Sequence, residues 1–440
     1  MKSLFVITAC VLLSHTFMSH AQILKDINKR VENKVKQRAN RKVDKTVDKG
    51  LDKVEEAGKN VPGKDDKKEG TIAKEEPMRS NDRNVGMGNA SGNTFKVNSK
   101  FDFVAGDKVV AIDDFARANV GDFPSEWHTN GSGEIVTVEG QQGKWLEMRG
   151  DFTYYPEFIK DLPDNFTLEF DLIFNNDITF LVKNIFGLYI VAADEKSRNE
   201  PAYRYGFNEP GKGGAAIEFE SYKPDRLNIF RWSNKKIDQD SKSFSEVGFI
   251  KSLRNQKVRV SVWRQKERVR MYLNDDKIVD APRLLAAGEH YNMIKFAFED
   301  NKNNGRAYVS NVRFAESSPD MRSKLINEGK FVTSGIYFNT ASDEIKRESY
   351  GILREIAEAL KTSEHIRIKI VGHTDSDGSD ESNLALSRKR AQSVQDALIR
   401  DFGIESSRIE TDGRGESDPI APNSSEEGKA NNRRVEFIKL

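Results

Sequence analysis

One stretch of the sequence brings opposite charges into a spacing that suits ligand binding. Residues 372–390 read GHTDSDGSDESNLALSRKR, with Asp375 near the start and Arg390 at the end. Asn383 and Arg390 are seven residues apart, close to two turns of a helix, so both side chains leave a helix on the same face. Helical side chains lean toward the helix start, which directs Arg390 back toward the loop that holds Asp375.

This arrangement offers one anion and one forked cation to a ligand. A planar guanidinium donates two parallel hydrogen bonds to a carboxylate, while a carboxylate such as Asp375 accepts from an ammonium. The predicted chemistry is therefore the binding of a ligand that carries both charges. Spacing alone is explained equally well by an ion pair between Asp375 and Arg390 that only fixes the loop.

Hydrophobic periodicity in residues 321–440 predicts the elements that position these side chains, a compact α+β unit. Strands are predicted over residues 331–338, 366–372, 408–411 and 433–439, and helices after Ser342 and over residues 383–402. Ser342 is expected to cap the first helix, with Asp343 and Glu344 in its first turn. The expected inward residues are Ile345, Ile352, Leu353, Ile356 and Leu360 in the first helix and Leu386, Ala391, Val394 and Leu398 in the second. Asp375 follows a central strand at its carboxyl end, where α/β sheets gather ligands.

Together with residues 413–436, GRGESDPIAPNSSEEGKANNRRVE, this stretch resembles the OmpA-like C-terminal domain of Gram-negative envelope proteins. The GHTD loop, the N..LS..RA helix and the closing NRRVE carry the resemblance. Domains of that family bind the diaminopimelate side chain of peptidoglycan, which ends in an ammonium and a carboxylate on one carbon. The resemblance implies a non-enzymatic cell-envelope protein that binds peptidoglycan non-covalently.

The resemblance also implies which positions bind the ligand: Asp375, Asn383, Arg390 and Arg433. Three further candidates are Asn339, Thr340 and Asp377. Asn339 stands where many family members have Asp, which leaves the contribution of this first loop open. Asp377 replaces a more common neutral residue and adds negative charge that favours the ligand's ammonium.

No cofactor, metal or nucleic acid is predicted as a partner. Residues 375–380 read DSDGSD, but an EF-hand calcium loop needs glycine at its sixth position and an acid at its twelfth. Here glycine is fourth and the twelfth position is Leu386. Lys and Arg total 70 against 69 Asp and Glu, and the net charge of +1 gives no overall attraction to nucleic acid.

The N-terminal residues predict export. Lys2 precedes an apolar run over residues 4–13, and small residues end at Ala21, so residues 1–21 are typical of a signal peptide. Lipidation at Cys10 is the alternative, although cleavage there leaves a short apolar core. We expect a protein of the periplasm, associated with the cell wall at the inner face of the outer membrane.

Residues 22–57 predict a charged amphipathic helix with an apolar residue at every fourth position. That spacing winds the apolar line around the helix, which favours a solvated stalk. Contact of its basic first half with an anionic membrane surface is the alternative. Residues 58–100 contain few large apolar side chains, which predicts a flexible linker.

Residues 101–316 predict an all-β sandwich, because short runs alternate apolar and polar residues between turn signals. Leu168, Phe170 and Leu172 form one such run, and 274–276 (NDD) predict a hairpin turn. The strand order resembles concanavalin-like or laminin-G-like jelly rolls, a resemblance of fold alone. Its partner is left open as a glycan or a protein.

The sandwich leaves one alternative function: a cell-wall-tethered carbohydrate-active enzyme or lectin. EFD at 169–171 and EFE at 218–220 each place two carboxylates on one strand face. Solvent-facing acids on alternating strands explain both motifs more simply. The aromatic candidates for sugar stacking are Trp127, Trp145, Tyr154, Tyr155, Trp232 and Trp263, which are expected to fill the core instead.

Overall fold

The computed structural model describes residues 101–150, 152–175, 186–193, 213–220, 226–233, 236–237, 242–245, 254–299, 305–318 and 321–440. The predictions for the signal peptide at 1–21, Cys10, the helix at 22–57 and the linker at 58–100 lie outside these residues. Among the described helices, none has the length and apolar character that a membrane crossing needs.

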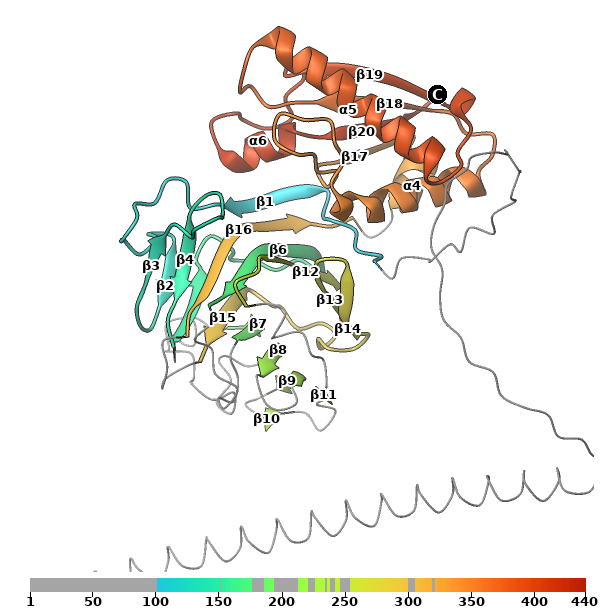
Figure 1. Cartoon of the computed structure of the whole chain (residues 1–440). Coiled ribbons are helices and arrows are strands. Elements are labelled where there is room, and N and C mark those ends of the chain that lie inside the picture. The colour runs from blue at the N-terminus through green and yellow to red at the C-terminus, as the bar shows by residue number, and fades with distance from the viewer. Residues whose placement is uncertain are drawn as a thin grey trace, which may run out of the picture. The chain divides into compact units, whose positions relative to one another are not determined.

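The middle of the chain forms two antiparallel sheets, referred to below as the two-sheet domain (Figure 1). Sheet A has the order β14-β13-β12-β6-β16-β4-β3, and β1 also pairs with β16. Its strands are β1 (Lys108–Asp113), β3 (Gly133–Val136), β4 (Trp145–Met148), β6 (Asn165–Phe174), β12 (Val258–Gln265), β13 (Arg268–Leu273), β14 (Asp276–Ala281) and β16 (Ala307–Glu316).

Sheet B has the order β10-β9-β8-β7-β15-β5-β2, and β11 also pairs with β9. Its strands are β2 (Trp127–Thr129), β5 (Phe152–Pro156), β7 (Phe186–Ala192), β8 (Gly213–Glu220), β9 (Arg226–Ser233), β10 (Lys236–Ile237), β11 (Lys242–Ser245) and β15 (Met293–Phe298). The prediction of a mostly β middle region is confirmed, whereas the jelly-roll topology stays a prediction.

The two sheets share one apolar core. Alternate residues of β6 point into it, and Phe170 of sheet A meets Phe296 of sheet B edge to face with ring centroids 5.1 Å apart. The hairpin predicted at residues 274–276 joins β13 to β14, and Asn274 adopts a positive φ of 51°, which asparagine tolerates better than most residues. Period-two patterning therefore predicted this core correctly.

Residues 321–440 form the C-terminal domain around a sheet of order β17-β20-β18-β19 (Figure 1). Its elements are α3 (Met321–Ser323), η2 (Lys324–Glu328), β17 (Lys330–Thr333), η3 (Arg347–Ser349), α4 (Tyr350–Thr362), β18 (Ile368–His373), α5 (Asp380–Arg400), η4 (Ser406–Arg408), β19 (Ile409–Gly415), α6 (Glu426–Asn432) and β20 (Val435–Lys439). Helices α4 and α5 share one apolar core with β18 and β20, and β18 lies between its neighbours as predicted.

The segment between β17 and α4 differs from the prediction. The strand ends at Thr333 rather than residue 338, and α4 begins at Tyr350 rather than after Ser342. The hydroxyl of Ser342 accepts the Glu344 N–H at 3.0 Å in a local turn, because the preceding Ala341 has a positive φ of 53°. Short polar residues favour such turns as readily as helix caps, and their sequence does not separate the two.

Burial of the two long helices follows the prediction closely. The expected residues Ile352, Leu353, Ile356 and Leu360 of α4, and Ala391, Val394 and Leu398 of α5, are all buried. Ile345 lies outside α4, and both Ile345 and Leu386 are only half-buried.

The two domains pack against each other through an apolar contact. Phe103, Trp263 and Tyr272 lie in the same cluster as Ile352 of α4. Contact is so close at Gly351 that a Cβ atom there would lie 1.6 Å from the Phe103 carbonyl oxygen. Glycine is therefore required where the segment before β1 crosses α4.

Candidate functional site

The predicted acid lies in the loop that follows β18. Asp375 comes two residues after the strand and is only 7% exposed. Its Oδ1 accepts the Asp377 N–H at 3.2 Å, and the preceding residue, Thr374, donates its N–H to the Gly415 carbonyl at 2.9 Å. The loop is thus tied to itself and to the end of the neighbouring parallel strand, which holds the carboxylate in place.

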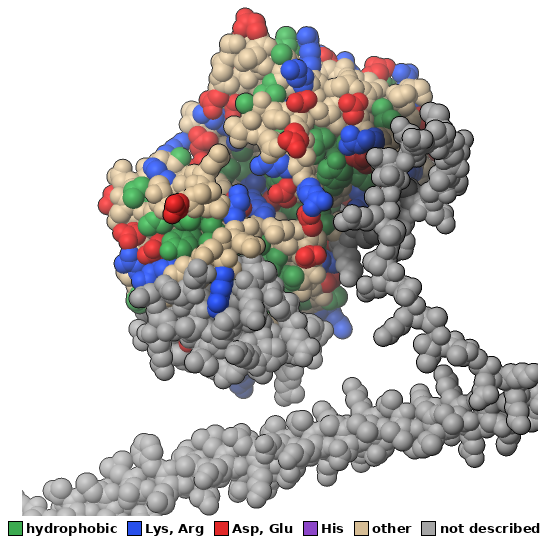
Figure 2. All heavy atoms as spheres, in the orientation of Figure 1, with side chains coloured by type: hydrophobic (Ala, Val, Ile, Leu, Met, Phe, Trp, Pro, Cys, Tyr) green, Lys and Arg blue, Asp and Glu red, His purple; other side chains and the backbone are tan. Residues whose placement is uncertain are grey.

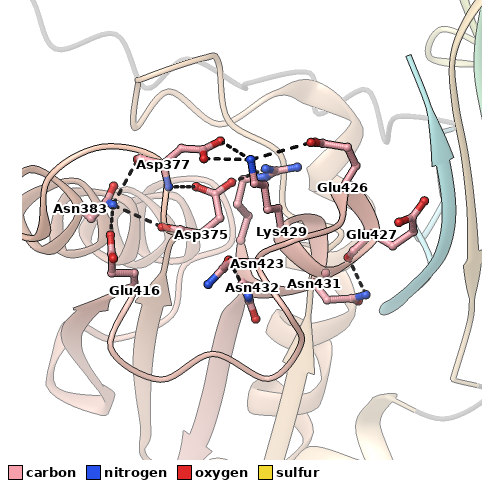
Figure 3. A network of polar contacts seen from close by, with 12 residues as sticks. Asp375, Asp377, Asn383, Glu416, Asn423, Glu426, Glu427, Lys429, Asn431 and Asn432 are labelled. Carbon is pink, nitrogen blue, oxygen red and sulfur yellow. Dashed lines mark hydrogen bonds and ion pairs between the residues drawn. The ribbon is translucent and has the colours of Figure 1, made fainter. Parts of the chain in front are cut away.

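Asn383 braces this loop from the first turn of α5. Its Nδ2 donates to the Asp375 carbonyl at 3.3 Å, to the Asp377 carbonyl at 3.2 Å and to Oε2 of Glu416 (Figure 3). The helix begins at a capping box in which Ser379 accepts the Ser382 N–H. Asn383 is 4% exposed, so its amide group supports the loop from the protein interior. Its contact with Glu416 was not predicted from the sequence.

Arg433, rather than Arg390, forms the ion pair with Asp375. Nη1 of Arg433 contacts Oδ2 of Asp375. Arg433 follows α6 directly, and the buried Asn432 before it accepts the Ile420 and Ala421 N–H groups at 2.8 and 3.0 Å. Asn432 thereby fixes the end of α6, a role that the sequence analysis missed although Asn432 begins the NRRVE motif.

Arg390 is held by residues 338–342 instead. Its Nε donates to the Ser342 carbonyl at 3.0 Å, and its guanidinium lies 4.9 Å from the centre of the Phe338 ring. Burial lowers the pKa of Arg390, the nearby charge of Arg433 lowers it further, and Asp375 opposes both effects. Arg390 therefore lies within electrostatic reach of both residues of the ion pair, although it does not bond to Asp375.

The further candidates sit at the edges of the site. Asn339 is exposed and donates from Nδ2 to Oε2 of Glu344 at 2.6 Å, and Thr340 is exposed. Asp377 is paired with Lys429, whose Nζ lies 2.9 Å from Oδ1 (Figure 3). That hydrogen bond raises the pKa of Lys429. The negative charge expected from Asp377 is thus compensated by a lysine that the sequence analysis did not single out.

Behind the site lies a buried charge network around His373. The ring is 3% exposed, and burial, assisted by the charge of Arg434, lowers its pKa to about 4. Glu436 forms ion pairs with Arg434, whose Nη2 lies 2.8 Å from Oε1, and with Lys330, whose Nζ lies 2.8 Å from Oε2. His373 is therefore neutral near pH 7, which agrees with a structural role.

A groove connects this site with the two-sheet domain. It has a volume of about 990 Å³, and both Arg390 and Arg433 line it together with Thr340. Figure 2 shows Lys and Arg side chains gathered where the surface between the two domains is hollowed. The groove is of the size that ligand sites commonly have.

Three acids of these motifs in the two-sheet domain are buried rather than solvent-facing, so the prediction is wrong for them. Glu169 is 0% exposed, Asp171 6% and Glu218 3%. Oε1 of Glu169 accepts from Arg313 at 2.9 Å and from the Tyr337 hydroxyl at 2.8 Å. The C-terminal domain covers this face of β6, a tertiary contact that an alternating pattern does not reveal.

The aromatic candidates for sugar stacking fill the interior, as expected. Trp127, Trp145, Tyr154, Tyr155, Trp232 and Trp263 are all at most 9% exposed. Among the described parts of the chain, no group of three or more His, Cys, Asp or Glu side chains is placed to hold a metal ion.

Comparison with known proteins assigns residues 337–433 to the OmpA family. Outer membrane porin F of Pseudomonas aeruginosa is 39% identical over 101 residues, which cover 23% of this chain and 29% of that protein. Probable lipoprotein YiaD of Escherichia coli is 42% identical over 144 residues, 30% of this chain and 64% of that protein. Peptidoglycan-binding protein ArfA of Mycobacterium tuberculosis is 40% identical over 108 residues, 24% of this chain and 33% of that protein.

The chain thus spans less than two thirds of each of these relatives. Among solved structures, the peptidoglycan-associated lipoprotein from Burkholderia pseudomallei is 32% identical, covering 24% of this chain and 88% of that one with a TM-score of 0.23. The C-terminal domain is an OmpA family domain over residues 337–433.

Proposed function

We propose that this protein binds peptidoglycan non-covalently through the diaminopimelate side chain and so tethers its two-sheet domain to the cell wall. The observation that carries the proposal is the grouping of Asp375, Arg390 and Arg433 at the carboxyl end of β18. One acid and two guanidiniums match a ligand tip that carries one ammonium and one carboxylate.

Charge balance supports this ligand. Asp375 already pairs with Arg433, so a zwitterion can lie beside the pair with its ammonium at Asp375 and its carboxylate at the arginines. Each charge then meets an opposite one, and no buried charge loses its partner, a loss that would be strongly destabilising. A ligand with only an ammonium leaves Arg390 without an anion, so the site favours diaminopimelate over lysine.

The other proposed site residues act around this centre. Asn383 holds the loop, while Asn339, Thr340 and Asp377 border the approach to it. A relative named as a peptidoglycan-binding protein is 40% identical over 108 residues, which supports the ligand class.

Location follows from the same ligand. We place the protein in the periplasm as an exported, cell-wall-associated protein at the inner face of the outer membrane, with the two-sheet domain available to a glycan or protein partner. For the helix predicted at residues 22–57, contact of its basic first half with the membrane surface is the alternative to a solvated stalk. Cell fractionation tests both proposals.

The enzyme alternative has less support. Glu169 and Asp171, the first carboxylate pair, are engaged by Arg313 and Arg259 rather than open to a substrate. Incubation of the full chain with a glycan panel tests the alternative, since turnover would favour an enzyme and binding without turnover a lectin.

The decisive experiment is a pulldown with purified peptidoglycan. The full chain should be retained by diaminopimelate-type peptidoglycan and much less by lysine-type peptidoglycan, in which the side-chain carboxylate is missing. Asp375→Ala and Arg390→Ala should each abolish retention. Asp396→Ala and Arg388→Ala, exposed positions of the same helix, serve as matched controls. Normal retention of both site variants would remove the assignment.

A further inference from the structure

The groove beside Arg390 has walls from both domains, and these walls are fixed relative to each other. Arg313 of β16 donates to Glu169 of β6 at 2.9 Å and to the hydroxyl of Ser334, after β17, at 3.1 Å. Asn431 of α6 exchanges hydrogen bonds with the backbone of Val109 in β1 at 2.9 and 2.8 Å. The two-sheet domain is therefore a structural wall of the site.

Cations outnumber acids in the lining of the groove, where the acids are Asp114, Asp171 and Glu348. Lys257 and Arg259 of the two-sheet domain line it together with Lys346, Arg390 and Arg433 of the C-terminal domain. Arg259 is not available to a ligand in the same way, because it donates to Asp171 at 3.2 Å and to the Asn311 carbonyl at 2.9 Å.

Three cations that line the groove have no close carboxylate partner among the described residues. Within the described residues, Arg390 and Lys346 have no carboxylate within ion-pair distance, and Lys257 reaches Asp171 only at 3.9 Å. The Lys257 side chain is half exposed at 50%. The proposed zwitterionic tip is neutral overall and uses only Arg390 and Arg433, so Lys257 and Lys346 remain available to a further anion.

We infer that Lys257 of the two-sheet domain and Lys346 bind a second carboxylate of the same peptide that carries the diaminopimelate, so that both domains share one ligand site. This inference rests on the proposed function. A stem peptide carries a free carboxylate on its D-glutamate besides the diaminopimelate tip, and its residues are spaced by about 3.5 Å along an extended chain. The groove, at about 990 Å³, exceeds the needs of the tip alone.

The test compares two ligands on the full chain by isothermal titration calorimetry. Free meso-diaminopimelate reports the tip, and the tripeptide L-Ala-γ-D-Glu-meso-diaminopimelate reports the tip together with the second carboxylate. Lys257→Ala should weaken tripeptide binding about three- to fivefold, as expected for a partly exposed charge pair. Binding of free diaminopimelate should not change.

Two controls make the result specific. Lys160→Ala, at an exposed position of the two-sheet domain that does not line the groove, should bind both ligands like the unmodified chain. Amidation of the D-glutamate carboxylate removes the contacts to both lysines, so it should weaken binding to the unmodified chain by at least that factor and remove its advantage over Lys257→Ala.

The outcomes separate this inference from the proposed function. Equal tripeptide affinity for Lys257→Ala and the unmodified chain, with binding lost in Asp375→Ala, overturns the shared site and leaves the diaminopimelate site standing. Failure of the unmodified chain to bind either ligand overturns both. A loss of free diaminopimelate binding in Lys257→Ala also overturns the inference, because the lysine would then act on the tip.

Discussion

Replacement of Arg390 by lysine tests whether this residue binds the ligand carboxylate. In the structure, Nε of Arg390 is used by the Ser342 carbonyl at 3.0 Å, which orients the guanidinium and leaves its two Nη groups for a ligand. Arg390→Lys keeps the positive charge, loses this orienting bond and presents a single ammonium. The substitution therefore separates forked hydrogen bonding from simple charge.

The magnitude follows from the lost hydrogen bond. A guanidinium donates two bonds to a carboxylate, and lysine replaces at most one of them. A hydrogen bond to a charged group contributes about 1.5–3 kcal/mol, so free diaminopimelate should bind roughly 10- to 150-fold more weakly. The preference for diaminopimelate over Nα-acetyl-L-lysine amide, whose only charge is the side-chain ammonium, should shrink by a similar factor, because that ligand has no carboxylate for Arg390.

Isothermal titration calorimetry with free meso-diaminopimelate and with Nα-acetyl-L-lysine amide measures both quantities. Arg388→Lys, an exposed position two residues earlier on α5, is the matched control and should bind normally. Circular dichroism checks the fold of each variant. If Arg390→Lys bound diaminopimelate within about threefold of the unmodified chain, the reasoning that assigns the carboxylate to this guanidinium would be refuted.

Three further predictions concern the framework of the site. Because the pKa of His373 falls from 6.5 in the unfolded chain to about 4 in the folded one, stability should be full above pH 6.5 and decline by up to about 3 kcal/mol as the pH drops to 4; thermal melts should show a smaller decline for His373→Gln. Glu169→Ala leaves the buried Arg313 without its anion and should destabilise the protein by about 3–5 kcal/mol in urea unfolding, while Glu289→Ala, at an exposed position, should not. Gly351→Ala forces a Cβ atom against the Phe103 carbonyl, so hydrogen exchange of residues 101–105 should rise; unchanged exchange would contradict the close contact.

Much of the C-terminal domain could be predicted because its local patterns agree with its tertiary contacts. Ile352, Leu353 and Ile356 recur at helical spacing and are buried. The loop after β18 was placed correctly because the alternation of Ile368 and Ile370 ends at a glycine. Such elements can be predicted from local sequence alone, without knowledge of residues far along the chain.

Pairing within the site was not predictable in the same way. Helical spacing correctly places Asn383 and Arg390 along α5, but it does not show that Arg433, 58 residues from Asp375, takes the ion pair. Phe338 and Ser342 hold Arg390 from a segment predicted as strand and helix cap, although it forms a turn with a positive φ at Ala341. Long-range contacts of this kind leave no periodic signal.

Burial of Glu169 has a consequence for how the tether works. Glu169 is 0% exposed and accepts from Arg313 of its own sheet and from the Tyr337 hydroxyl of the C-terminal domain. A hydrogen bond to a buried acid therefore joins the two domains in addition to the apolar contact at Phe103. Separating the domains would expose apolar surface and break the hydrogen bonds of Tyr337 to Glu169 and of Arg313 to Ser334, and each is unfavourable. The wall of the groove that carries Lys257 should therefore stay in place while ligand binds or leaves, so the two-sheet domain contributes to affinity without a closing motion.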